Sequence, residues 1–284
     1  SETWKPAAGS SESWGILALL TVTIGGPYWV LSANTPLLQA WFSREKPGAS
    51  PYRLFALSNA GSLLALVSYP FLVEPGLSLR MQVYVWSGTF VVFAAFCGWC
   101  AFRVFRSNET PIPEANSTDS LAPQDAVEPP RGLGLFDALL VLLLPACACV
   151  LLLATTNQMS QDLPVVPFLW VLPLALYLLS FIICFDRERW YWRPLWIVLL
   201  AAGLGGIYYA LEVGVDLSSF GQVGIYAGAL FACCMVCHGE LARLKPHPRF
   251  LTGYYLLIAL GGALGGAFVT LAAPRLFQGF WEFQ

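Results

Sequence analysis

The stretch LFDALLVLLLPACACVLLLAT, residues 135–155, decides the fold class of this chain. Its 21 positions contain a single charged residue, Asp137, close to the start. A helix of about 20 mainly apolar residues is long enough to cross the roughly 30 Å hydrocarbon layer of a membrane. The stretch therefore predicts a transmembrane helix.

Seven more stretches of similar length and composition lie along the chain. The eight predicted spans are residues 14–34, 52–74, 81–104, 135–155, 164–185, 191–211, 219–241 and 250–273. Of all residues 57% are apolar and 11% are charged, whereas about 25% are charged in an average soluble domain. The sequence therefore predicts an all-α integral membrane protein, a polytopic bundle of about eight transmembrane helices in contact with membrane lipid.

The positive charges lie almost entirely on one side of these spans. Twelve of the 15 Lys and Arg residues follow the first, third, fifth or seventh span: Arg44, Lys46, Arg53, Arg103, Arg106, Arg131, Arg187, Arg189, Arg193, Arg243, Lys245 and Arg249. The remaining three are Lys5, Arg80 and Arg275. Because loops rich in Lys and Arg stay in the cytoplasm, the pattern predicts that both chain ends lie outside.

One long polar stretch, residues 107–134, divides the chain. It contains five prolines and five acidic residues, and such a segment cannot bury enough apolar surface to offset its ordering entropy. We expect a flexible cytoplasmic loop between a first membrane part of three helices, residues 1–106, and a second part of five helices, residues 135–284. The start Ser1-Glu2-Thr3 has neither Met nor a basic leader. We expect a processed or truncated product, although a complete chain with an outside N-terminus is the alternative.

Glycine and proline mark two structural features of the spans. Pro27, after Gly25-Gly26, is expected to kink the first span. The last span carries two overlapping pairs of glycines four residues apart, Gly261, Gly262, Gly265 and Gly266. Glycine at this spacing allows another helix backbone to approach closely, so these residues predict a helix-packing face.

Two groups of polar side chains are candidates for a functional site. The inner group, near the arginine-rich side, comprises Asn34, Gln39, Arg53, Asn59, His238 and Glu240. The outer group comprises Tyr69, Glu74, Gln158 and Asp162, and Asp162 is placed to cap the fifth span. Each group can line a ligand pocket between helices. Each can equally supply helix caps and interhelical hydrogen bonds.

The segment Cys234-Met235-Val236-Cys237-His238 matches C-x-x-C-H, the attachment pattern of c-type haem. A metal site built on the same three residues, Cys234, Cys237 and His238, is a second interpretation. The motif falls at the predicted cytoplasmic end of its span, whereas haem c is attached on the outer face of the bacterial membrane. His247 is the only other histidine. We therefore expect these cysteines to pack as small apolar residues, with no cofactor.

Several longer strings carry a resemblance to a known family. They are LSANTPLLQAWF (31–42), YPFLVEP (69–75), TNQ (156–158), PFLWVLP (167–173) and HGEL (238–241). Together they resemble the membrane portion of bacterial spermidine-synthase-like proteins, in which a multispanning region precedes a soluble aminopropyltransferase-like domain. The resemblance implies a multi-pass protein of the bacterial inner membrane. It also implies that any aminopropyl transfer would need a domain that this sequence lacks.

No catalytic template is present: the sequence contains no G-x-S-x-G, H-E-x-x-H or Walker loop. The leading hypothesis is a non-catalytic membrane module that acts as a scaffold, anchor or accessory subunit, with a protein partner in the membrane and no nucleic acid. One alternative is a transporter or binder of a small molecule such as a polyamine. The other is a haem-bearing electron-transfer subunit.

Overall fold

The computed structural model describes residues 12–45, 51–107, 134–162, 168–214 and 217–276. Every regular element in these ranges is a helix, and the ranges contain no strand. The predicted loop at 107–134 lies outside the described residues except for its first and last positions.

The helices follow the predicted order. The first part contains α1 (Glu12–Leu20), η2 (Thr21–Gly25), α2 (Gly26–Ser32), α3 (Asn34–Glu45), α4 (Tyr52–Ser68), η3 (Tyr69–Val73), α5 (Glu74–Gly76) and α6 (Leu79–Ser107). The second part contains α7 (Leu135–Asp162), α8 (Phe168–Asp186), η4 (Glu188–Trp190), α9 (Arg193–Val213), α10 (Ser219–Arg243), η6 (Pro248–Phe250), α11 (Leu251–Ala267), η7 (Phe268–Ala272) and α12 (Ala273–Leu276).

Six helical stretches in the described residues are long and apolar enough to cross a membrane. They are Tyr52–Gly76, Leu79–Arg106, Leu135–Ser160, Arg193–Val213, Ser219–Arg243 and Leu251–Leu276. The chain is therefore a multi-pass membrane protein. The first predicted span is instead two helices, Gly15–Gly25 and Tyr28–Ser43, which meet at 57° on either side of Pro27. The fifth is a shorter apolar helix, Trp170–Asp186, whose predicted start lies outside the described residues.

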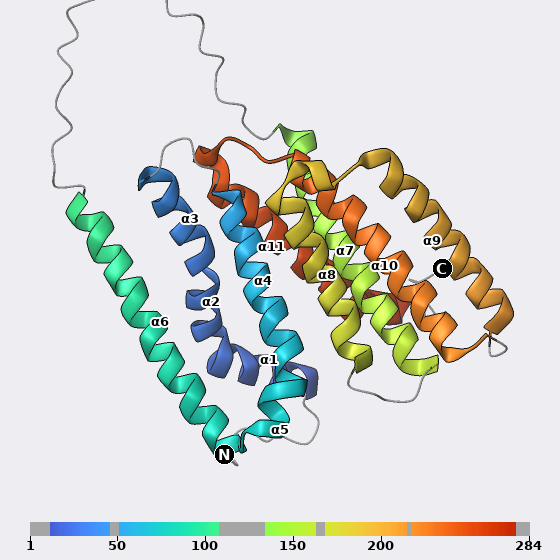
Figure 1. Cartoon of the computed structure of the whole chain (residues 1–284), viewed down its shortest axis with the longest axis horizontal. Coiled ribbons are helices and arrows are strands. Elements are labelled where there is room, and N and C mark those ends of the chain that lie inside the picture. The colour runs from blue at the N-terminus through green and yellow to red at the C-terminus, as the bar shows by residue number, and fades with distance from the viewer. Residues whose placement is uncertain (1–11, 46–50, 108–133, 163–167, 215–216, 277–284) are drawn as a thin grey trace, which may run out of the picture.

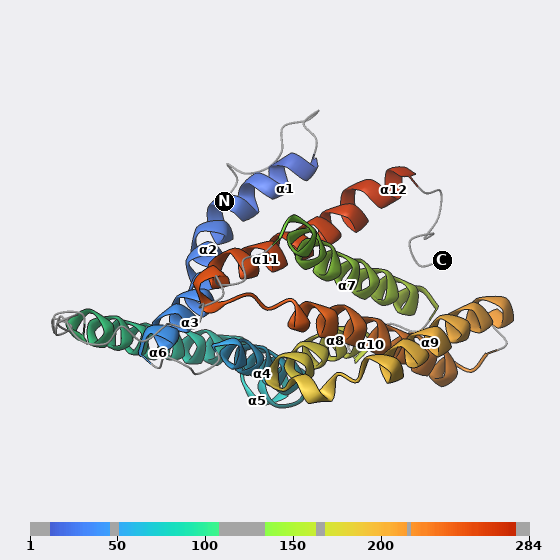
Figure 2. The same cartoon turned by 90° about the horizontal axis from the view of Figure 1, so that it is seen from above.

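The helices form two layers around α10. Seen from above, α6, α4, α8 and α9 lie in a row with α10, and α7 and α11 lie behind that row (Figure 2). Helix α10 packs against α7, α8 and α9, and α11 packs along α7. In the most apolar stretch of α10 half of the residues are buried inside the protein, compared with 28% in the corresponding stretch of α7. The core of the protein is therefore centred on α10.

Small residues allow the closest helix contacts. Gly261 and Gly265 of α11 lie directly against the carbonyl oxygens of Leu142 and Ala146 in α7. Gly203 of α9 lies against Ala229 of α10, where an added β-carbon would stand 2.9 Å from the Ala229 Cα. In contrast, a β-carbon at Gly262 or Gly266 would have no neighbouring contact within 4 Å. Two of the four predicted packing glycines therefore face α7 and two do not.

Three prolines are each preceded by one wide, π-helical turn. Pro27 follows Thr21–Gly25, Pro75 follows Tyr69–Val73, and Pro274 follows Phe268–Ala272. The middle residue of each turn, Thr23, Phe71 or Thr270, lies four positions before its proline. A proline ring collides with the carbonyl group four residues earlier, and a wider turn at that point gives the ring room.

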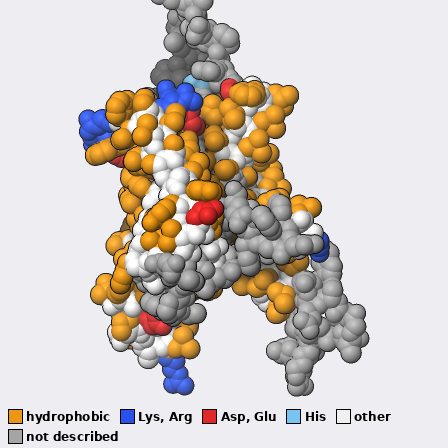
Figure 3. Space-filling model, turned by 90° about the vertical axis from the view of Figure 1, so that its right-hand side faces the viewer, with side chains coloured by type: hydrophobic (Ala, Val, Ile, Leu, Met, Phe, Trp, Pro, Cys, Tyr) orange, Lys and Arg blue, Asp and Glu red, His pale blue; other side chains and the backbone are white. Residues whose placement is uncertain are grey.

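Helix α6 stands apart from the bundle. It lies at one edge of the molecule (Figure 1). No residue in its most apolar stretch is buried against the other described residues. Aromatic side chains such as Trp86, Phe96 and Trp99 are exposed along it. On the opposite edge, hydrophobic side chains also cover much of the surface, and most of the visible Lys and Arg side chains lie toward its upper end (Figure 3). Apolar side chains on the outside and arginines at one end suit a bundle surrounded by lipid.

Candidate functional site

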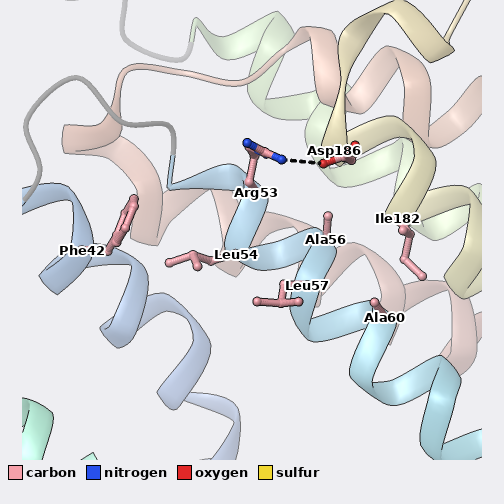
Figure 4. A pocket seen from close by; sticks show the side chains of 8 residues that line it. All are labelled: Phe42, Arg53, Leu54, Ala56, Leu57, Ala60, Ile182 and Asp186. Carbon is pink, nitrogen blue, oxygen red and sulfur yellow. Dashed lines mark hydrogen bonds and ion pairs between the residues drawn. The ribbon is translucent and has the colours of Figure 1, made fainter.

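A cavity of about 660 Å³ lies between α3, α4 and α8 (Figure 4). Its walls are apolar over most of their extent. At one end, Arg53 Nη2 lies 3.3 Å from Asp186 Oδ1. The lining residues are Phe42, Arg53, Leu54, Ala56, Leu57, Ala60, Ile182 and Asp186.

The spacing of residues in two helices explains this arrangement. In α4 the lining residues Arg53, Ala56, Leu57 and Ala60 are three, four and seven positions apart, which places them on one face of a helix. In α8, Ile182 and Asp186 are four positions apart, again on one face. Arg53 and Asp186 therefore lie one to two helical turns from the apolar lining residues of the same helices. The small side chains of Ala56 and Ala60 leave the space that larger residues would fill.

The charged end of the cavity carries an excess of positive charge. Asp186 faces two arginines, because Arg187 Nε lies 3.4 Å from Asp186 Oδ2. The Arg53 side chain is 64% exposed and that of Asp186 is 37% exposed. Ion pairs this open to solvent contribute little to stability. Arg53 is therefore able to turn toward an anionic ligand at small cost to the fold.

His238 occupies the centre of the bundle, where it is fully buried. Its Nδ1 lies 2.8 Å from the Ser180 Oγ, and the Ser180 hydroxyl also lies 2.7 Å from the Tyr177 carbonyl oxygen. Because a carbonyl only accepts, the Ser180 hydroxyl donates to Tyr177, and the proton between Ser180 and His238 belongs to Nδ1. The His238 Nε2 lone pair then has no hydrogen-bond partner in the described part of the chain. The Phe181 ring stacks on the imidazole at 3.6 Å.

The two motif cysteines are buried beside His238. Cys234 and Cys237 pack in one cluster with Ala148 of α7 and Leu230 of α10. The described residues hold no group of three His, Cys, Asp or Glu side chains that could bind a metal ion. Both cysteines are buried among apolar side chains of α7 and α10.

Glu240, two residues after His238 in α10, joins this helix to the start of α9 and to Tyr191 just before it. Its Oε1 accepts a hydrogen bond from the Tyr191 hydroxyl at 2.8 Å and an ion pair from Arg193 Nε at 2.8 Å. Arg243 Nη1 lies 3.9 Å from the same atom. Burial, together with the neighbouring Glu240 carboxylate, raises the pKa of Tyr191, so its hydroxyl remains a donor. Gly239 makes this possible, because the Tyr191 ring lies where a β-carbon at position 239 would stand.

The rest of the predicted inner group is used for local structure. The Asn34 amide donates to the carbonyls of Val30 and Leu31, and that of Asn59 donates to the Phe55 carbonyl at 2.8 Å. These bonds stay within their own helical stretches. The inner group is therefore not one site, since it divides between the cavity at Arg53, the buried His238 and the Glu240 contacts.

Gln39 of α3 is the exception among these amides. Its side chain is fully buried, and both of its polar atoms lack a hydrogen bond of good geometry to any described residue. The Tyr255 hydroxyl of α11 lies beside it and is also unsatisfied by that criterion. A small adjustment of either side chain would pair the two groups, as buried polar groups generally are.

Tyr69, Glu74 and Gln158 of the outer group do not line the cavity at Arg53. The Tyr69 hydroxyl donates to Gln82 Oε1 at 3.1 Å. Glu74 is exposed in α5 and Gln158 is half-buried in α7. Asp162 ends α7, and its side chain, with the predicted cap on the fifth span, lies outside the described residues.

Sequence reasoning did not assign a role to three of the residues above. Ser180 is, besides Tyr177, the one hydroxyl in the apolar run of α8, and that isolation was a usable signal for an interhelical hydrogen bond. Asp186 and Tyr191 flank the segment RERW, where a surface loop is the simpler interpretation. Their partners, Arg53 and Glu240, lie 133 and 49 residues away.

Comparison of the chain with protein-family models, with curated proteins and with solved structures found no match.

Proposed function

We propose that this chain is a non-catalytic module of a membrane assembly, and that it docks a transmembrane helix of another protein along α6. The observation that carries the proposal is the isolation of α6. It is 29 residues long, exposes large apolar side chains along its length, and is not buried against the other described helices.

Small residues on α6 and α4 support a protein partner rather than lipid alone. Ala94 and Gly98 of α6 are four positions apart and exposed, as are Gly61 and Ala65 of α4. A β-carbon at Gly61 or Gly98 would meet nothing within 4 Å. The same spacing at Gly261 and Gly265 is filled by α7. Helices in lipid associate mainly through such close van der Waals contacts, so these faces suit a helix that binds from outside the chain.

The proposal includes an orientation and a location. We propose that the chain crosses the bacterial inner membrane eight times. Both chain ends then lie outside, and the arginine-rich end of the bundle lies in the cytoplasm. The bent pair around Pro27 and the shorter helix α8 supply the two crossings beyond the six long spans. The resemblance to the membrane portion of spermidine-synthase-like proteins agrees with this placement, and aminopropyl transfer would belong to a separate domain.

Co-purification under mild detergent tests the docking proposal. The tagged chain is extracted from its own membranes and analysed by native mass spectrometry. We expect Ala94→Leu with Gly98→Leu to remove a co-purifying membrane protein, because the added side chains fill the docking face. Val92→Leu with Phe96→Leu, on the opposite side of α6, is the matched control and should retain the partner. A native chain that is always isolated alone at 31.1 kDa would rule the proposal out.

A second candidate function, binding or transport of a small amphiphile, is favoured by the cavity in Figure 4. The apolar wall with Arg53 at one end suits an alkyl chain with an anionic head. A polyamine fits less well, because Asp186, the acidic group among the described lining residues, already faces Arg53 and Arg187. Calorimetric titration with laurate should show binding that Arg53→Gln weakens and Arg103→Gln does not. Binding of spermidine in place of laurate would reverse this assignment.

A further inference from the structure

A second cavity lies at the arginine-rich end of the bundle. Its volume is about 560 Å³. The end of α8, η4, the start of α9 and the last turns of α10 line it, and it is separate from the cavity at Arg53. The lining residues are Cys184, Arg189, Tyr191, Trp192, Arg193, Pro194, Gly239, Ala242 and Arg243.

Positively charged side chains line this cavity. Among the side chains that the structure describes, three arginines line it and no acidic residue does. The Glu240 carboxylate contacts Arg193 at 2.8 Å and Arg243 at 3.9 Å. Among the described side chains, one carboxylate therefore faces two of the three arginines. The Arg189 side chain is exposed and lines the cavity, and it forms no ion pair with another described side chain.

The backbone adds to this attraction. Helix α9 begins at Arg193 without a side-chain cap on its N-terminus, and Arg193 and Pro194 both line the cavity. The first N–H groups of a helix lack partners within the helix, and the helix dipole favours an anion there. The α9 N-terminus and the three guanidinium groups therefore favour the same kind of ligand.

The aromatic side chains around the cavity place it at the depth of lipid headgroups. Trp190 and Trp192 are both exposed beside it. Exposed tryptophans gather at the boundary between the hydrocarbon layer and water. Tyr191 forms the inner wall, where its hydroxyl donates to Glu240 and its ring covers Gly239. The cavity thus opens at the level where the phosphates of phospholipids lie.

The geometry points to a binding site for a phosphate group, supplied by the headgroup of an anionic phospholipid, with Arg189 and Arg243 as its main ligands. Guanidinium groups bind phosphate oxygens in a bidentate manner and remain charged at every physiological pH. Arg193 is held by Glu240 and shapes the wall. Basic pockets between membrane helices near the headgroups are the setting in which anionic lipids are recognised. Free phosphate shares this chemistry and is the second source. The assignment does not depend on the docking proposal for α6.

The test measures binding of short-chain lipids to the full chain in detergent by native mass spectrometry. The probes are dioctanoyl phosphatidylglycerol, dioctanoyl phosphatidylcholine and inorganic phosphate. We expect one phosphatidylglycerol per chain, bound about tenfold more tightly than phosphatidylcholine, since hydrogen bonds to charged groups are worth about that factor. Arg189→Gln with Arg243→Gln should abolish this preference. Arg189→Lys with Arg243→Lys should restore part of it, because charge is kept without the bidentate geometry.

The matched control is Arg103→Gln with Arg106→Gln, which removes the same two charges from the arginine-rich end of α6 outside the cavity. This variant should keep the preference for phosphatidylglycerol. Competition by millimolar inorganic phosphate would identify free phosphate as a sufficient ligand, and absence of competition would assign the site to lipid. Equal loss of preference in both glutamine variants would show only diffuse surface charge and would overturn the proposal. Equal binding of phosphatidylcholine, or no binding of any probe, would do the same.

Discussion

The carbonyl oxygen of Leu142 in α7 occupies the place where a β-carbon at Gly261 of α11 would stand. One turn further on, Gly265 has the same relationship to Ala146. Both helices repeat the contact after four residues, so the two backbones run against each other over more than a turn. In lipid, where apolar side chains gain nothing by leaving water, this close contact is a principal source of helix association.

Gly261→Ala and Gly265→Ala should therefore each destabilise the bundle. The added methyl group meets backbone, which cannot move aside cheaply, and overpacking of this kind costs about 1–3 kcal/mol. Thermal unfolding of the detergent-solubilised chain measures the effect. Gly262→Ala and Gly266→Ala are the controls, one position along, where a β-carbon meets nothing within 4 Å. Equal losses at all four glycines would contradict the contact described here.

Ser180→Ala should destabilise the protein by leaving the His238 Nδ1–H without an acceptor. A buried donor without a partner costs about 1–3 kcal/mol. Ser180→Thr keeps the hydroxyl and should recover part of the stability. Ser160→Ala provides the comparison, because the Ser160 hydroxyl bonds only the Thr156 carbonyl of its own helix. An unchanged unfolding temperature in Ser180→Ala would show that His238 does not depend on this bond.

Tyr191 should make the stability of the bundle sensitive to alkaline pH. Its pKa is raised in the folded state by burial and by Glu240, whereas an unfolded tyrosine titrates near pH 10. The folded state therefore keeps a proton that the unfolded state loses. The stabilisation is complete below about pH 10 and is lost as the pH rises above that value. Unfolding temperatures between pH 8 and 11 should fall less steeply for Tyr191→Phe than for the native chain. If the unfolding temperatures of the two proteins fall equally with pH, Tyr191 does not contribute to the pH dependence of stability.

The two ends of α6 should lie on opposite sides of the membrane. Ser78→Cys lies just before the first turn of α6 and Ser107→Cys lies at its last residue. The two variants therefore report the side of the membrane on which each end of this helix lies. In intact cells a membrane-impermeant thiol reagent should label Ser78→Cys above the native background and label Ser107→Cys only after permeabilisation. The reverse pattern would invert the proposed orientation, and labelling of both from outside would show that α6 does not cross.

The helical architecture was predictable from composition and segment length, because the hydrocarbon layer requires long apolar helices. The packing glycines were predictable as a group. Their division into Gly261 and Gly265 against Gly262 and Gly266 depends on how α11 is rotated toward α7, which the glycine pattern itself does not determine. The bend at Pro27 was predictable, because a proline disturbs the hydrogen bonds of the helix in which it lies.

The sites were less predictable because they depend on contacts between distant segments. Arg53 and Glu240 stood out as charges near predicted spans, but their partners Asp186 and Tyr191 are assigned only by the tertiary fold. Asn34 and Asn59 looked similar in the sequence and bond their own backbones instead. An amide near a helix end has both options, and only the packing of the neighbouring helix decides between them.

The wide turns before Pro27, Pro75 and Pro274 change how the surface of this protein has to be mapped. Each such turn accommodates about one residue more than a regular turn, and one residue corresponds to about 100° of rotation around a helix axis. A helical wheel drawn continuously through Leu251–Leu276 therefore assigns Arg275 to the wrong side, although it places Gly261 correctly. Substitutions designed to face lipid or a partner beyond these turns need a one-position offset. Insertion or deletion of a single residue at Phe268–Ala272 would be absorbed there with the least disturbance to the contact between α11 and α7.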